Sequence, residues 1–124
     1  MPEGERKLKS VLVVEDDPLL CLGLEQALRD AGAGKVITAK SAVEALTEFE
    51  GQGPDVIILD LHLADSDEGF GLAEIALQLF HPPPEIPFST GSPDRIPERL
   101  AGLGQIFEKP YDPAELARKA LGLT

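Results

Sequence analysis

The sequence predicts an α/β fold in which five parallel strands form a doubly wound sheet covered by helices on both faces. Short apolar runs alternate with helical patterns five times along the 124 residues, and such alternation requires right-handed crossovers between parallel strands. Two of the runs, residues 11–14 and 56–59, are wholly apolar and mostly β-branched, which is typical of strands buried on both faces. We therefore expect strands at residues 10–14, 35–39, 55–59, 86–89 and 105–108.

The first helix is predicted between Asp17 and Gly32. Asp17 is a suitable N-cap, and Pro18 fits the first helical position, where no backbone N–H is needed. The apolar residues expected on its inward face recur at roughly helical spacing: Leu19, Leu20, Leu22, Ala27, Leu28 and Ala31. Cys21 has no second cysteine with which to form a disulfide, so we interpret it as a small apolar residue of this helix.

The second helix is predicted to begin at Ser41 and to end at Gly51. Ser41 and Glu44 have the spacing of a capping box, and Leu46 and Phe49 are expected to face the core. After the third strand, a loop rich in Asp and Gly leads to a helix around residues 71–80, which the three prolines at 82–84 interrupt.

The last two strand–helix units are less regular. Pro87 weakens the fourth strand because proline has no N–H for a ladder bond, and Pro97 lies inside the helix predicted near residues 93–103. The final helix is predicted at residues 113–121, with Gly122 at its end.

Composition and charge argue against several classes of protein. With 11 Lys and Arg against 22 Asp and Glu, the net charge is −11, and the chain has no basic run to neutralise nucleic-acid phosphates. No apolar run approaches the length of a membrane span, and the N-terminal residues are too polar for a signal peptide, so we expect a cytoplasmic protein. The length predicts one domain at residues 9–124, after a flexible tail at residues 1–8.

Polar side chains follow four of the predicted strands, at the sheet edge where functional groups gather in a doubly wound fold. The first strand leads to Glu15 and Asp16, the third to Asp60, the fourth to Ser89 and Thr90, and the fifth to Lys109. Crowded carboxylates offer the hard oxygen ligands that Mg²⁺ prefers, and this ion together with Lys109 would offset their mutual repulsion. The alternative is a solvated acidic rim, which is common on a protein of this charge.

Four short motifs stand at these strand ends: Val14-Glu-Asp-Asp17, Leu59-Asp-Leu61, Ser89-Thr-Gly91 and Glu108-Lys-Pro110. In order and spacing they resemble the motifs of response-regulator receiver domains of two-component signalling, and the resemblance covers essentially the whole chain. It implies a flavodoxin-like fold with strand order 2-1-3-4-5. The stretch Phe88-Ser-Thr-Gly91 also resembles the Phe-Ala-Thr-Gly of a subgroup of stand-alone, single-domain receivers.

The resemblance implies a phosphorylation site that contains a metal ion. Asp60 matches the phosphoacceptor, Glu15 and Asp16 match the acidic pair, and all three are implied to hold Mg²⁺. The main-chain carbonyl of His62 would be a further ligand. The side chain of His62 is either a residue that influences how fast water removes the phosphate or an exposed loop residue.

The resemblance also implies how the phosphoryl group is held and read. Thr90 matches the hydroxyl that contacts it, and Lys109 matches the lysine that pairs with it. The implied partners are a histidine kinase or histidine phosphotransferase and a downstream protein, which reads the fourth helix, fifth strand and fifth helix. No enzymatic activity is implied beyond self-catalysed phosphorylation and dephosphorylation of the aspartate.

One departure from the family pattern leaves alternatives open. Most members carry Tyr or Phe three residues before the lysine as a switch, whereas this chain has Ile106, and Phe107 is expected to point to the opposite face. The chain is then either a switching receiver, a phosphate sink, or a pseudo-receiver that binds proteins independently of phosphorylation. Lys109-Pro110 resembles the family's usual cis peptide.

Other kinds of site are not supported. A calcium loop at residues 65–69 has its glycine at the fifth position instead of the sixth, and Ala76 stands where the terminal Glu belongs. Gly69-Phe-Gly71 lacks the third glycine of a dinucleotide fingerprint, and no Gly-Lys-Ser/Thr phosphate loop occurs. An aspartyl phosphatase needs a second acid two residues after the first, and here that residue is His62.

Overall fold

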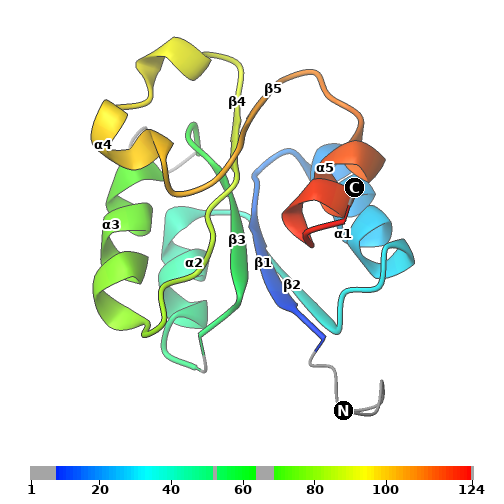
Figure 1. Cartoon of the computed structure of the whole chain (residues 1–124), viewed down its shortest axis with the longest axis horizontal. Helices are drawn as coiled ribbons and strands as arrows, with labels where there is room; N and C mark the ends of the chain where they lie inside the picture. Colours follow the sequence, from blue (N-terminus) through cyan, green and yellow to red (C-terminus); the bar gives the residue numbers. More distant parts are fainter. Residues whose placement is uncertain (1–7, 52, 64–68, 124) are drawn as a thin grey trace.

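A parallel five-stranded sheet lies between two layers of helices (Figure 1). The computed structural model describes residues 8–51, 53–63 and 69–123. The strands are β1 (Ser10–Val14), β2 (Lys35–Ala39), β3 (Val56–Asp60), β4 (Phe88–Thr90) and β5 (Ile106–Glu108), in the order β2-β1-β3-β4-β5. The helices are α1 (Pro18–Asp30), α2 (Ala42–Glu48), α3 (Gly69–Leu79), α4 (Glu98–Ala101) and α5 (Pro113–Ala120), with a 3-10 turn, η2 (Pro93–Arg95), before α4. The predicted fold class and strand order are confirmed.

Alternate residues of the central strands build two cores. In β1, Val11 and Val13 pack against α1 and α5, whereas Leu12 and Val14 pack against α2 and α3. Every residue of β3 is buried, which is why residues 56–59 are continuously apolar. Within the described residues, none of the helices has the length and apolar character that crossing a bilayer requires.

Local signals fix the beginnings of the first two helices as predicted. The Asp17 carboxylate accepts a hydrogen bond from the N–H of Leu19 at 3.0 Å, and Pro18 occupies the first helical position. The Ser41 hydroxyl accepts from the N–H of Glu44 at 3.1 Å, and the Glu44 carboxylate reaches back to the N–H of Lys40 at 3.0 Å. Each helix start therefore has side-chain acceptors for its free N–H groups.

Three leucines predicted to face the core lie on the surface instead. Leu19 and Leu22 of α1 are 80% and 62% exposed, because Cys21, Leu24 and Leu28 form the buried stripe. Leu46 of α2 is 41% exposed for a related reason. The short α2 buries Ala45, its C-cap Phe49 is also buried, and Leu46, one position after Ala45, is turned by about 100° from it.

Leu20, Ala27 and Ala31 are partly buried against the core between the sheet, α1 and α5, as predicted. Cys21 is buried in the same core and acts as a small apolar residue there.

Prolines also shift the predicted elements in the second half of the chain. The fourth strand is Phe88–Thr90 instead of residues 86–89, because Pro87 contributes only its carbonyl, which accepts from the N–H of Leu59 at 3.0 Å. The helix predicted at residues 93–103 is not continuous. Pro97 has no N–H with which to extend the turn that precedes it, and it is the N-cap of the short α4.

Smaller differences concern boundaries. The third strand is Val56–Asp60 instead of residues 55–59, the fifth is Ile106–Glu108 instead of 105–108, and α3 begins at Gly69 instead of near residue 71. The Lys109–Pro110 peptide is cis, as the family resemblance implied. Apart from the exposed Leu8, the predicted tail lies outside the described residues, and so do residues 65–68 of the rejected calcium loop.

Candidate functional site

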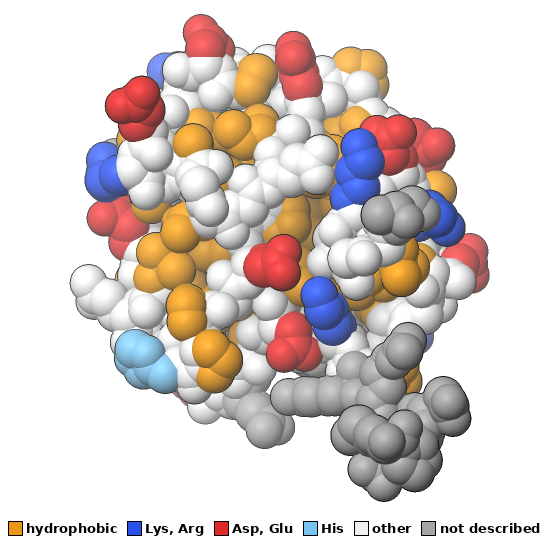
Figure 2. Space-filling model, viewed as in Figure 1, with side chains coloured by type: hydrophobic (Ala, Val, Ile, Leu, Met, Phe, Trp, Pro, Cys, Tyr) orange, Lys and Arg blue, Asp and Glu red, His pale blue; other side chains and the backbone are white. Residues whose placement is uncertain are grey.

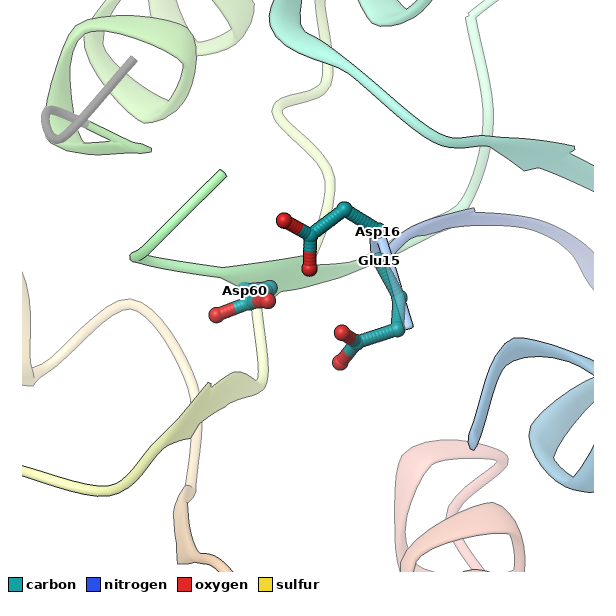
Figure 3. A group of neighbouring side chains, drawn as sticks. All are labelled: Glu15, Asp16 and Asp60. Atoms are coloured by element: carbon teal, nitrogen blue, oxygen red, sulfur yellow. The ribbon is translucent and has the colours of Figure 1, made fainter. Parts of the chain in front are cut away.

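Three carboxylates meet at the carboxyl ends of β1 and β3. Figure 3 shows the side chains of Glu15, Asp16 and Asp60 pointing toward one another from these two neighbouring strands. One oxygen of each lies within 4.8 Å of those of the other two. We refer to these three residues as the acidic cluster, which the topology brings together as the sequence predicted.

Burial separates the acidic cluster from an ordinary solvated rim. Glu15 is 1% exposed and Asp60 is 2% exposed, while Asp16 is partly exposed. On the face drawn in Figure 2, by contrast, most Asp and Glu side chains stand scattered over the surface. The predicted alternative of a solvated rim is therefore wrong for Glu15 and Asp60, since water does not compensate their charges.

Main-chain N–H groups hold two of the carboxylates. The N–H of His62 donates to Oδ1 of Asp60 at 3.0 Å, and the N–H of Asp17 donates to Oε2 of Glu15 at 3.1 Å. Both donors lie two residues after the acceptor, so each carboxylate is oriented by the backbone turn that directly follows it. The side chain of Asp17 caps α1 and is exposed, as predicted.

Lys109 is the cation of the site. Its Nζ lies 3.1 Å from Oε1 of Glu15 and 3.3 Å from Oδ2 of Asp60, and its side chain is 29% exposed. Burial lowers the pKa of Lys109, but the charge of Asp60 and the hydrogen bond and charge of Glu15 more than offset this, so the pKa is raised overall. Lys109 is therefore a fixed positive charge between two buried acids.

One ammonium does not fully compensate the acidic cluster. Burial, followed by a hydrogen bond with Asp60, raises the pKa of Glu15 to about 7, although the N–H of Asp17 and Lys109 act in the opposite direction. Oε1 of Glu15 is buried, and its one partner among the described residues is the ammonium of Lys109 at 3.1 Å. Three carboxylates with oxygens this close together, and one ammonium among them, fit a hard divalent cation such as Mg²⁺.

The two hydroxyl residues predicted at this edge differ in their contacts. Thr90 is fully buried, and its Oγ1 accepts from the N–H of Ser92 at 2.9 Å. The carbonyl of Thr90 accepts from the N–H of Lys109 at 2.8 Å, so the backbone joins these two predicted site residues. Ser89 instead pairs with the hydroxyl of Tyr111 at 2.8 Å.

Sequence reasoning missed Tyr111, although it follows Lys109 by two residues and is the single tyrosine of the chain. The predicted orientations of its neighbours are confirmed. Ile106 packs on the side of α2 and α3, and Phe107 packs on the side of α1 and α5. The side chain of His62 is exposed.

Comparisons with known proteins agree with this geometry. The sequence model of the response regulator receiver domain matches residues 11–121. The phyllosphere-induced regulator PhyR of Methylorubrum extorquens is 28% identical over 113 residues, which are 86% of this chain and 40% of PhyR. The transcriptional regulatory protein TrcR of Mycobacterium tuberculosis is 30% identical over 114 residues, 91% of this chain and 44% of TrcR. The chain thus spans less than half the length of either relative.

Solved structures have the same architecture over almost the whole chain. The chemotaxis response regulator CheY4 of Vibrio cholerae is 27% identical with a TM-score of 0.75, and the match covers 94% of this chain and 98% of CheY4. The PhyR receiver domain of Erythrobacter litoralis is also 27% identical with a TM-score of 0.75, covering 93% of this chain and 91% of that domain.

Proposed function

This chain belongs to the response regulator receiver domain family, and we propose that Asp60 is its phosphoacceptor, which takes a phosphoryl group from a phosphorylated histidine of a kinase or phosphotransferase. The observation that carries the proposal is the position of Asp60, which is 2% exposed and lies 3.3 Å from Nζ of Lys109 within the acidic cluster. A carboxylate attacks an anionic phosphoryl group only where nearby positive charge neutralises the transferring oxygens.

The proposed reaction exchanges one phosphorus bond for another. A carboxylate oxygen of Asp60 attacks phosphorus, the bond between phosphorus and the donor histidine nitrogen breaks, and an acyl phosphate is left on Asp60. The acidic cluster and the main-chain carbonyl of His62 would hold Mg²⁺, which would supply positive charge for the oxygens of the transferring group. The N–H of His62 orients the nucleophile through Oδ1, and the ammonium of Lys109, 3.3 Å from Oδ2, would pair with the new group.

The acyl phosphate would change the pairing of hydroxyl and ammonium groups around it. Its phosphoryl group carries roughly −1.5 to −2 units of charge in place of the carboxylate charge, and it offers new acceptor oxygens toward which Thr90 and Lys109 can move. The proposed signal passes through the face formed by α4, β5 and α5 to a downstream protein. Water then hydrolyses the acyl phosphate and returns the domain to its first state. A cytoplasmic location stays a prediction.

A second candidate function is a pseudo-receiver that binds a partner without phosphorylation, and a third is a phosphate sink. Ile106 favours both, because an aliphatic side chain stands where most family members carry the aromatic switch. The presence of all the predicted site residues favours phosphorylation over the pseudo-receiver.

The first experiment is incubation with Mg²⁺ and acetyl phosphate, followed by intact-protein mass spectrometry. We expect one phosphoryl group on the wild-type protein and none on Asp60→Asn. Asp17→Asn is the matched control, because it changes an exposed acid beside the acidic cluster while asparagine still caps α1. A wild-type protein that stays unmodified here, and with every histidine kinase in a phosphotransfer screen, would establish the pseudo-receiver instead.

A second experiment separates a switch from a sink. Beryllofluoride, a phosphoryl mimic, is added with Mg²⁺, and backbone amide shifts are followed by NMR. A switch is expected to change amides from Thr90 through Lys109, whereas changes confined to Asp60 and its immediate neighbours indicate a sink.

A further inference from the structure

A hydrogen bond between two side chains joins β4 to the segment before α5. The hydroxyl of Tyr111 lies 2.8 Å from Oγ of Ser89, which is 1% exposed. The ring of Tyr111 is partly buried and packs edge-on against Phe107, with ring centroids 6.1 Å apart and an interplanar angle of 61°. The phenol is therefore held by packing on its ring and by one specific polar contact at its tip.

This bond adjoins the acidic cluster. Ser89 pairs with Asp60 of β3 on one side and with Phe107 of β5 on the other. Register partners in a parallel sheet place their side chains on the same face, here the face covered by α1 and α5. Ser89 is thus the direct cross-strand neighbour of the proposed phosphoacceptor.

Tyr111 also lies close to Lys109 along the chain. It lies two residues after Lys109 and one before Asp112, the N-cap of α5. Burial raises the pKa of Tyr111, the bond to Ser89 acts in the opposite direction, and the charges of Glu15, Lys109 and Asp60 also act on it. The phenol is consequently neutral at neutral pH and within the electrostatic field of the acidic cluster.

Besides the parallel pairing of β4 with β5, two links join the end of β4 to residues that follow β5. One is the main-chain hydrogen bond from the N–H of Lys109 to the carbonyl of Thr90 at 2.8 Å. The other is the pair of hydroxyls of Ser89 and Tyr111, one residue before Thr90 and two residues after Lys109. The main-chain bonds hold the chain as far as the N–H of Lys109, and the hydroxyl pair is a further link that ties the residues after Lys109 to β4.

We propose that Tyr111 is a positioning residue for phosphoryl transfer to Asp60, and that it acts through Ser89 by fixing Thr90 relative to Lys109. The inference rests on the proposed function, since it concerns the same reaction. If the ring of Tyr111 merely filled space, phenylalanine would serve as well. The hydroxyl of Tyr111 has a role separate from that of its ring, because it lies within hydrogen-bond distance of the buried hydroxyl of Ser89.

The test is a double-mutant cycle of wild type, Ser89→Ala, Tyr111→Phe and the double variant. The rate of phosphorylation by acetyl phosphate is measured with saturating Mg²⁺, and Mg²⁺ affinity is measured separately by calorimetry. Each single variant is expected to react roughly 3- to 10-fold more slowly, because it loses one hydrogen bond next to the reacting group. The double variant is expected to react no more slowly than either single variant, since both changes break the same bond.

Two further measurements separate positioning from a general loss of stability. Mg²⁺ affinity is expected to stay within about twofold of wild type, because neither substitution removes a member of the acidic cluster. Val11→Ala is the matched control: it shortens a buried side chain at the far end of β1, in the same core, and should lower stability without slowing phosphorylation.

The outcomes are distinct. If wild type and Tyr111→Phe react at the same rate, the positioning role is refuted while the proposed function stands. It is also refuted if the slowed rates multiply in the double variant, or if Val11→Ala slows the reaction as much. If wild type itself gains no phosphoryl group, the proposed function fails, and the positioning role fails with it.

Discussion

Glu15→Gln is expected to stabilise the metal-free protein above neutral pH, although it removes a side chain of the proposed site. Folding transfers the Glu15 carboxyl to a site that is 1% exposed, and burial, followed by the hydrogen bond with Asp60, raises its pKa from 4.5 to about 7. Folding therefore favours the protonated form. The contribution of this group to stability is fully present below pH 4.5 and is lost as the pH rises through about 7.

The magnitude follows from the difference between the two pKa values of Glu15, 4.5 and about 7. At about 1.4 kcal/mol per pH unit, ionised Glu15 lowers the free energy of unfolding by about 3 kcal/mol at pH 8. At pH 5 Glu15 changes the free energy of unfolding by less than about 1 kcal/mol. Glutamine keeps an oxygen that can accept from the N–H of Asp17, so the variant resembles the protonated acid at every pH.

The assay is urea unfolding with excess EDTA at pH 5 and at pH 8. Glu15→Gln is expected to be more stable than wild type by about 3 kcal/mol at pH 8 and nearly equal to it at pH 5. Glu48→Gln changes an exposed acid of α2 and should alter stability by less than about 0.5 kcal/mol at either pH. A variant no more stable than wild type at pH 8 would mean that Lys109 already compensates the buried charge, and the reasoning above would be refuted.

Three further outcomes test other contacts. Lys109→Met leaves two buried acids without their shared cation, and we expect it to cost about 3 kcal/mol in urea unfolding at pH 8 without metal. Gly104→Ala would place a Cβ against the carbonyl of Ile86, which cannot yield, and should cost about 1–3 kcal/mol. Gly102→Ala is its control, because nothing lies within 4 Å of its added Cβ, and its thermal midpoint should stay unchanged or rise slightly. Cys21 is buried with a raised pKa caused by burial, so a thiol reagent at pH 8 should modify native protein roughly 100-fold more slowly than protein in urea.

The sequence was sufficient to predict the acidic cluster because topology determines where strand ends lie. Two continuously apolar strands must be central in a doubly wound sheet, and the residues that follow them must meet at one edge. Alternation along β1 also explains the unequal burial of the two acids that follow it. Val13 faces the core under α1 and α5, and Glu15, two residues later, continues toward that side, whereas Asp16 points away from it.

Other features depend on side-chain packing that a sequence pattern does not specify. Residues 19–28 contain more leucines than one buried stripe can hold, so periodicity alone did not distinguish Leu24 from the exposed Leu19 and Leu22. The contact between Ser89 and Tyr111 joins residues 22 apart in the chain. The contact depends on the course of the chain after Lys109, which no local sequence pattern specifies. The missed residue is therefore one whose importance arises only in three dimensions.

The charges of the site indicate which group would move if Asp60 accepts a phosphoryl group, as proposed. Lys109 pairs with Oδ2 of Asp60 and with Oε1 of Glu15, and acylation would remove the charge of the Asp60 carboxylate. A phosphoryl group beyond that oxygen would become the stronger anion, so the ammonium must shift outward from Asp60 to remain paired. The N–H of Lys109 donates to the carbonyl of Thr90, so a shift of Lys109 would also act on the end of β4. The proposed phosphorylation site would therefore be connected to the end of β4 through Lys109 itself, although Ile106 stands in place of the aromatic switch.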